Sequence, residues 1–181
     1  AYKIFYELSE NEVDSLSVYA FYWSGECKRY AGDIKTADEI YKKFLEKYPQ
    51  HSLAARAQLS KGTVYYTSNQ SKEAETSLIN ATIHGDVLTK GKAFTLLGEM
   101  KLNSNNYSDA RNYFSSALKF ISNDVQLSNR AKLGLAISEF YLNNFGSSLQ
   151  YLQELSSKYN DFESDKVNFY LAENYFARKE Y

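Results

Sequence analysis

Two stretches of this chain, beginning at Ile34 and at Tyr107, carry apolar residues at the same seven relative positions. These positions are Ile34, Ala37, Ile40, Tyr41, Phe44, Leu45 and Tyr48 in the first stretch and Tyr107, Ala110, Tyr113, Phe114, Ala117, Leu118 and Ile121 in the second. Steps of three and four residues place them on one side of an α-helix. A stripe that recurs along a chain indicates tandem repeats, in which stacked units share a continuous core and leave one long face open.

Small residues mark four copies of the repeated unit. One set is Ala37, Ala74, Ala110 and Ser148, which follow one another at spacings of 37, 36 and 38 residues. A second set, twelve residues earlier in each copy, is Gly25, Gly62, Gly98 and Ala136. Polar turns rich in Gly and Asn separate the two sets, and these residues can end a helix in the left-handed conformation. Each unit is therefore predicted to be two helices that cross closely at the small residues.

Composition agrees with an all-α interaction protein. The 21 Lys+Arg and 22 Asp+Glu give a formal net charge of -1, so no overall field favours nucleic acid or an anionic membrane. A single Pro and eight Gly leave few chain breaks, and the alternating pattern of strands is absent. No apolar run is long enough to span a bilayer, so we expect no direct membrane insertion.

The repeats resemble the tetratricopeptide repeat (TPR) family. The matching residues are Phe94, Leu97, Gly98, Tyr107, Ala110, Phe114, Ala117 and Leu118 in one unit and Phe21, Gly25, Gly32, Ala37, Tyr41, Phe44 and Pro49 in an earlier one. The resemblance implies a right-handed superhelical solenoid of antiparallel helix pairs. The period of 36–38 residues exceeds the usual 34, which suggests slightly longer helices or turns.

We expect one array along the whole chain. Its predicted parts are a partial second helix over 1–16, full helix pairs over 17–50, 54–87, 90–123 and 128–160, and the start of a further repeat over 164–181. Because the chain starts like the middle of a second helix and stops after a first helix that reaches Tyr181, it is expected to be a fragment of a longer protein. Exposed apolar ends would then allow end-to-end self-association.

One stretch is similar to the repeats of bacterial envelope TPR proteins, including outer-membrane assembly lipoproteins and Tol-Pal coordinator proteins. It covers residues 40–49 and continues with Ser52, Ala54 and Ala57. This resemblance favours the periplasm or cell envelope over the cytoplasm.

Residues that would carry catalysis or bind metal are scattered. The two histidines, His51 and His84, lie at predicted helix ends or loops without a neighbouring Cys or second His. The motifs of zinc proteases, thiol pairs and nucleophile elbows do not occur. We therefore expect no catalytic site, no metal and no cofactor.

In TPR arrays the first helix of each pair lines a concave groove, so the resemblance nominates groove residues. They are Tyr19, Tyr22, Arg29, Arg56, Tyr66, Lys92, Arg130, Phe140, Tyr141 and Lys166. The position that opens each first helix is basic four times running, beside aromatic residues, which suits an extended peptide with acidic and apolar side chains. The alternative is that the cations pair with Glu26, Glu99 or Glu173 and the aromatic rings pack between helices. A chaperone-type carboxylate clamp is disfavoured, because Glu26 occupies its usual Asn position.

Three functions remain open at this point. The first is a protein-interaction scaffold that binds a partner segment along the groove. The second is a structural role in which the convex or end surfaces assemble the protein. The third, RNA binding by a pentatricopeptide-like array, is disfavoured by the near-zero net charge.

Overall fold

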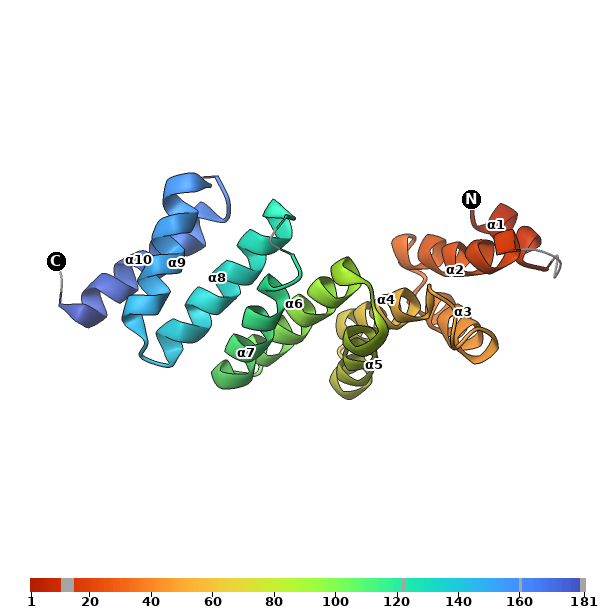
Figure 1. Cartoon of the computed structure of the whole chain (residues 1–181), viewed down its shortest axis with the longest axis horizontal. Coiled ribbons are helices and arrows are strands. Elements are labelled where there is room, and N and C mark those ends of the chain that lie inside the picture. Colours follow the sequence, from red (N-terminus) through yellow and green to blue (C-terminus); the bar gives the residue numbers. More distant parts are fainter. Residues whose placement is uncertain (11–14, 122, 160, 180–181) are drawn as a thin grey trace. The chain divides into compact units, whose positions relative to one another are not determined.

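The computed structural model describes residues 1–10, 15–121, 123–159 and 161–179. Within these residues the chain forms helices and no strands, so the predicted all-α fold of repeated helix pairs is confirmed (Figure 1). The ten helices are α1 (Tyr2–Glu10), α2 (Ser15–Tyr30), α3 (Ile34–Lys47), α4 (Ala54–Thr67), α5 (Ser71–His84), α6 (Val87–Asn103), α7 (Tyr107–Leu118), α8 (Val125–Tyr141), α9 (Phe145–Lys158) and α10 (Ser164–Arg178). Asn160 and Tyr181, where predicted segments end, lie outside the described residues.

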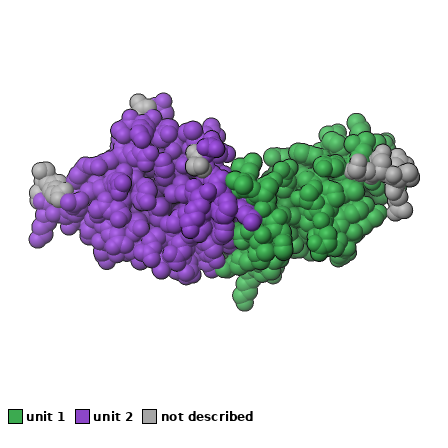
Figure 2. Space-filling model, in the orientation of Figure 1, with its two compact units in different colours: residues 1–89 green, residues 90–181 purple. Residues whose placement is uncertain are grey.

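The helices form two compact units, Ala1–Thr89 and Lys90–Tyr181, whose boundary falls in the first turn of α6 (Figure 2). In unit 1 each helix from α1 to α5 packs against the next, and α2 also contacts α4. In unit 2 the helices from α7 to α10 pack in the same sequential manner, α8 also contacts α10, and α6 joins α7 through Phe94. First helices of successive pairs therefore meet inside each unit. The superhelical course of the array stays a prediction.

The four turns between paired helices share one backbone conformation. Gly32, Asn69, Asn105 and Asn143 have positive φ angles of 75°, 59°, 57° and 61°. In each turn the next backbone N–H donates to the carbonyl five residues earlier, as from Asn106 to Lys101 at 2.8 Å. This bond closes the end of the first helix, and Gly and Asn are the residues that adopt its left-handed geometry at least cost. The predicted turn conformation is confirmed.

Paired helices cross where a small residue of the first faces a large side chain of the second. A Cβ added at the glycine would lie 2.8 Å from Tyr41 Cε1 at Gly25, 2.7 Å from Leu78 Cγ at Gly62 and 2.7 Å from Phe114 Cε1 at Gly98. All three large side chains are fully buried. In the fourth pair Ala136 and Leu152 take the same places and are also fully buried in one cluster.

The second set of small residues is buried as well. Ala37, Ala74, Ala110 and Ser148 are each 0% exposed. Ser148 departs from the alanine pattern because its hydroxyl accepts a hydrogen bond from Asn174 Nδ2 of α10 at 3.0 Å. Pro49 lies just beyond α3, where its ring cannot continue the helix. None of the described helices combines the length and apolarity needed to cross a lipid bilayer.

The glycine contacts predict opposite effects for two substitutions in unit 2. Gly98→Ala is expected to lower the free energy of unfolding by about 1–3 kcal/mol, because the new methyl group would overlap the fully buried Phe114 ring. Gly146→Ala is expected to raise it by roughly 0.5–1 kcal/mol, because nothing lies within 4 Å of its added Cβ in α9. Urea titrations followed by circular dichroism measure both. Equal effects of the two substitutions would contradict the close crossing.

Candidate functional site

The predicted groove residues of unit 1 differ in exposure. Tyr19 is 43% exposed and Arg56 is exposed, whereas Arg29 and Tyr66 are half-buried. Tyr22 is only 7% exposed and belongs to the apolar core formed by α2, α3 and α4. Its predicted place in the groove is therefore corrected to the core, because neighbouring helices close over its ring.

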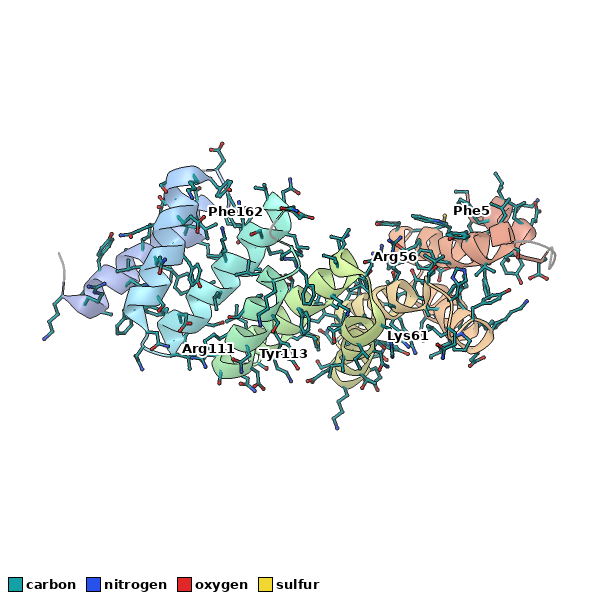
Figure 3. The ribbon with its side chains drawn as sticks, viewed as in Figure 1. Phe5, Arg56, Lys61, Arg111, Tyr113 and Phe162 are labelled. Atoms are coloured by element: carbon teal, nitrogen blue, oxygen red, sulfur yellow. The ribbon has the colours of Figure 1, made fainter. Side chains whose placement is uncertain are left out.

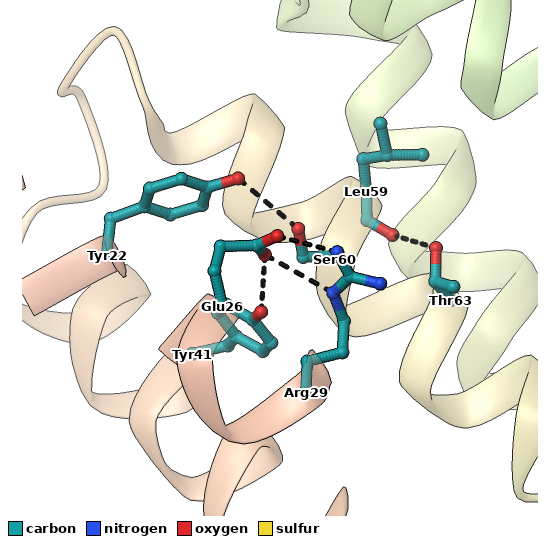
Figure 4. Close-up of polar contacts among 7 residues, drawn as sticks. All are labelled: Tyr22, Glu26, Arg29, Tyr41, Leu59, Ser60 and Thr63. Atoms are coloured by element: carbon teal, nitrogen blue, oxygen red, sulfur yellow. Dashed lines mark hydrogen bonds and ion pairs between the residues drawn. The ribbon is translucent and has the colours of Figure 1, made fainter. Parts of the chain in front are cut away.

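Glu26 of α2 is the centre of a buried polar network that connects α2, α3 and α4 (Figure 4). Its carboxylate accepts a hydrogen bond from the Tyr41 hydroxyl at 2.5 Å and from Arg29 Nη2 at 2.7 Å. The Tyr22 hydroxyl lies 3.4 Å from Ser60 Oγ of α4. Glu26 is 5% exposed, so this network supplies the partners that a buried carboxylate requires.

The network shifts the protonation of its members. Burial by itself raises the pKa of Glu26, but hydrogen bonds from Arg29, Ser60 and Tyr41 outweigh burial and bring the pKa below its usual value. Burial and the nearby Glu26 charge raise the pKa of Tyr22 to about 12, and the same causes raise the pKa of Tyr41. The carboxylate is therefore ionised and both phenols are protonated at neutral pH.

Most of the predicted basic row is matched by carboxylates of the chain itself. The pairs are Arg56 with Asp86 at 2.6 Å, Arg130 with Glu99 at 2.6 Å and Lys166 with Glu163 at 2.7 Å. Figure 3 shows Arg56 among the side chains of unit 1. Lys92 is exposed and forms no ion pair with any described residue. Three of the four cations are thus paired internally, but only Arg130 has a partner that the alternative named, Glu99, since Arg56 pairs with Asp86 and Lys166 with Glu163.

Aromatic side chains gather on α7, α8 and α10 in unit 2. Tyr141 is 46% exposed and stacks on Tyr107, with ring centroids 4.4 Å apart and an angle of 12° between the planes. Phe140 is half-buried and meets Tyr170 edge to face at 5.6 Å. Burial and contact with Tyr141 raise the pKa of Tyr170, whose phenol stays protonated at neutral pH. The structure therefore connects Tyr141 to a ring of α7 and Phe140 to a ring of α10.

Comparisons with known proteins agree on the fold. The tetratricopeptide repeat family model matches residues 19–51. A crystal structure of a tetratricopeptide repeat protein from Parabacteroides merdae superposes with a TM-score of 0.72 and 18% identity, covering 99% of this chain. This chain spans 66% of that protein's chain, slightly less than two thirds.

A second crystal structure is that of YrrB, described as a TPR protein with an unusual peptide-binding site. It matches with a TM-score of 0.79 and 19% identity, over 99% of this chain and 86% of that one. The fold is that of TPR proteins. No curated protein sequence matches the chain, and the envelope resemblance stays a prediction.

The helices of unit 2 border a cleft beside the basic row. Its lining residues are Lys92, Asp124, Gln126, Leu127, Arg130 and Phe162. They come from the starts of α6 and α8 and from the connection between α9 and α10, where Figure 3 labels Phe162. Lys92 and Phe162 thus line one cleft, a feature that spacing in the sequence does not reveal.

A second cleft, in unit 1, is lined by both His51 and His84. The sequence pattern places no second His or Cys beside either of them, but His51 lies shortly after the second helix α3 and His84 is the last residue of the second helix α5, and this shared position is the signal that could have connected them. His51 Nδ1 accepts a hydrogen bond from the Leu53 N–H at 3.1 Å and so holds the connection before α4. In the part of the chain that the structure describes, no three His, Cys, Asp or Glu side chains converge as metal ligands.

The lowered pKa of Glu26 predicts a pH-dependent contribution to stability. A carboxyl group with a lower pKa in the folded state stabilises the fold fully above its unfolded-state pKa, about 4.5, and loses that contribution as the pH falls through the folded-state pKa. Glu26→Gln is therefore expected to cost about 1–3 kcal/mol at pH 7 and less near pH 3. Urea titrations at both pH values measure this difference.

The exposed Glu39 of α3 provides the matched control. Glu39→Gln is expected to change stability by less than about 0.5 kcal/mol at either pH. A Glu26→Gln cost that is the same at both pH values would contradict an ionised, network-bound carboxylate.

Proposed function

We propose that the chain is a non-catalytic module that binds a segment of a partner protein on the exposed faces of its first helices. The observation that carries the proposal is the group of aromatic rings in unit 2. Tyr141, Phe169 and Phe176 are 46%, 56% and 68% exposed. Tyr141 and Phe169 each contact Tyr170. Exposed aromatic side chains are typical of binding surfaces, since they bury a large area at low entropic cost.

The TPR fold and its neighbour YrrB support the same proposal. YrrB is described as having an unusual peptide-binding site, and we extend peptide binding to this chain on the strength of its own exposed rings. Nucleic acid is a poorer partner, because the net charge is -1 and Arg56, Arg130 and Lys166 are already paired.

Selection from a random-peptide display library tests this function. Peptides enriched on the chain are expected to bind at least about tenfold more weakly to a Tyr141→Ala/Phe169→Ala variant, because the substitutions remove ring contact area. Asn112→Ala, at an exposed site on α7, is the control and is expected to retain binding. Circular dichroism checks that each variant is folded. If the enriched peptides bind the double variant as tightly as the unmodified chain, binding occurs elsewhere and the proposed surface is refuted.

A second candidate function, self-association, is favoured by exposed apolar side chains on α1 and α2. Ile4, Leu16 and Trp23 are 62%, 57% and 46% exposed. If they form a contact between copies, sedimentation velocity will show a concentration-dependent mass that an Ile4→Ser/Trp23→Ser variant loses. A mass that stays monomeric at all concentrations excludes this candidate.

A further inference from the structure

The aromatic rings of unit 2 form one connected set, which we call the aromatic surface: Tyr107, Phe140, Tyr141, Phe169 and Tyr170. Tyr141 stacks on Tyr107 at 4.4 Å and meets Tyr170 at 6.3 Å. Phe169 meets Tyr170 edge to face at 5.2 Å. Each ring is thus positioned by another ring, so little side-chain entropy remains to be lost when a ligand binds.

Glu173 adds a carboxylate to this surface. It lies four residues after Phe169 and three after Tyr170 on α10, which places it on the same helix face as both rings. The pKa of the Tyr170 phenol is raised mainly by burial and by Tyr141. The Glu173 charge makes a smaller contribution in the same direction. Among the residues that the structure describes, the half-buried Glu173 side chain forms neither an ion pair nor a hydrogen bond.

The carboxylate of Glu173 favours a cationic ligand beside the rings of α10. Arg130 and Lys166, the members of the basic row on α8 and α10, are held by Glu99 and Glu163. An acidic peptide would have to compete with those carboxylates, whereas a basic side chain would gain the unmatched charge of Glu173. Aromatic faces also attract cations through their quadrupoles.

Building on the function proposed above, we propose that the aromatic surface and Glu173 bind an extended, proline-containing segment of a partner protein that carries arginine or lysine. Proline rings pack on aromatic side chains, and a polyproline-type segment is already extended before it binds. Its basic side chains lie over the rings and reach the Glu173 carboxylate. This ligand chemistry differs from the acidic peptide that the sequence suggested.

Three fluorescein-labelled probe peptides, measured by fluorescence anisotropy, separate the contribution of proline packing from that of charge. One alternates Pro and Arg, the second Pro and Glu, and the third Ser and Arg. The Pro-Arg peptide is expected to bind at least about tenfold more tightly than the other two, since only it supplies both packing and the matching charge.

Variants of the chain assign the binding to the surface. Glu173→Gln is expected to weaken Pro-Arg binding about three- to tenfold, and Tyr141→Ala about tenfold or more. Tyr141→Phe keeps the ring and is expected to keep the binding. Tyr30→Ala removes the 76% exposed tyrosine of unit 1 and is expected to change nothing.

Tighter binding of the Pro-Glu peptide overturns the inference, as does Pro-Arg binding that is indifferent to Glu173→Gln and Tyr141→Ala. Absence of Pro-Arg binding also overturns it. The proposed function survives each of these results if library-selected peptides still depend on Tyr141 and Phe169. It fails separately, when library-selected peptides do not depend on those two residues.

Discussion

The close crossing of paired helices is the contact on which the rest of the structure depends. Gly98 brings the backbone of α6 near enough for the Phe114 ring of α7 to fill the space between them. Because interiors are packed to high density, a larger residue at the glycine would separate the helices. The same pairing of a small and a large residue occurs in all four helix pairs, so one local rule sets the repeated geometry. The face of each first helix that points away from this crossing is then available for other uses.

The chain uses polar contacts where the repeated apolar pattern is interrupted. Glu26 lies in a first helix among apolar neighbours, and three helices supply its partners. Ser148 replaces an alanine and is matched by Asn174 of the next helix. A buried polar group lowers stability when it has no hydrogen-bond partner, and it favours one particular packing arrangement when it has one. We infer that these two sites fix how neighbouring repeats meet inside each unit, beyond what apolar packing alone would fix.

Sequence periodicity predicted the fold well because it reports local constraints. The spacing of Gly25 and Ala37 located the helix crossing, and Gly and Asn located the turns, since both depend on residues within one unit. Exposure was harder to predict: Tyr22 occupies a groove position in the repeat pattern but is buried. Its burial depends on α3 and α4, which no pattern within α2 encodes. The approach of His51 and His84 to one cleft has the same non-local origin.

Charge matching was the least predictable property and has the largest consequence for binding. A basic residue near the start of four first helices suggests an acidic ligand only while the partners of these cations are unknown. Asp86 pairs with Arg56 from 30 residues away, so helix periodicity could not assign that pair. Glu163 is the N-cap residue of α10 and pairs with Lys166 three residues later, a spacing that periodicity allows but does not require. On the proposed aromatic surface, Glu173, which forms no ion pair with a described residue, then counts for more in our proposal than the number of basic residues does. The ligand preference of such a surface is therefore set by the charges that remain after internal pairing, and these follow from the folded structure rather than from composition.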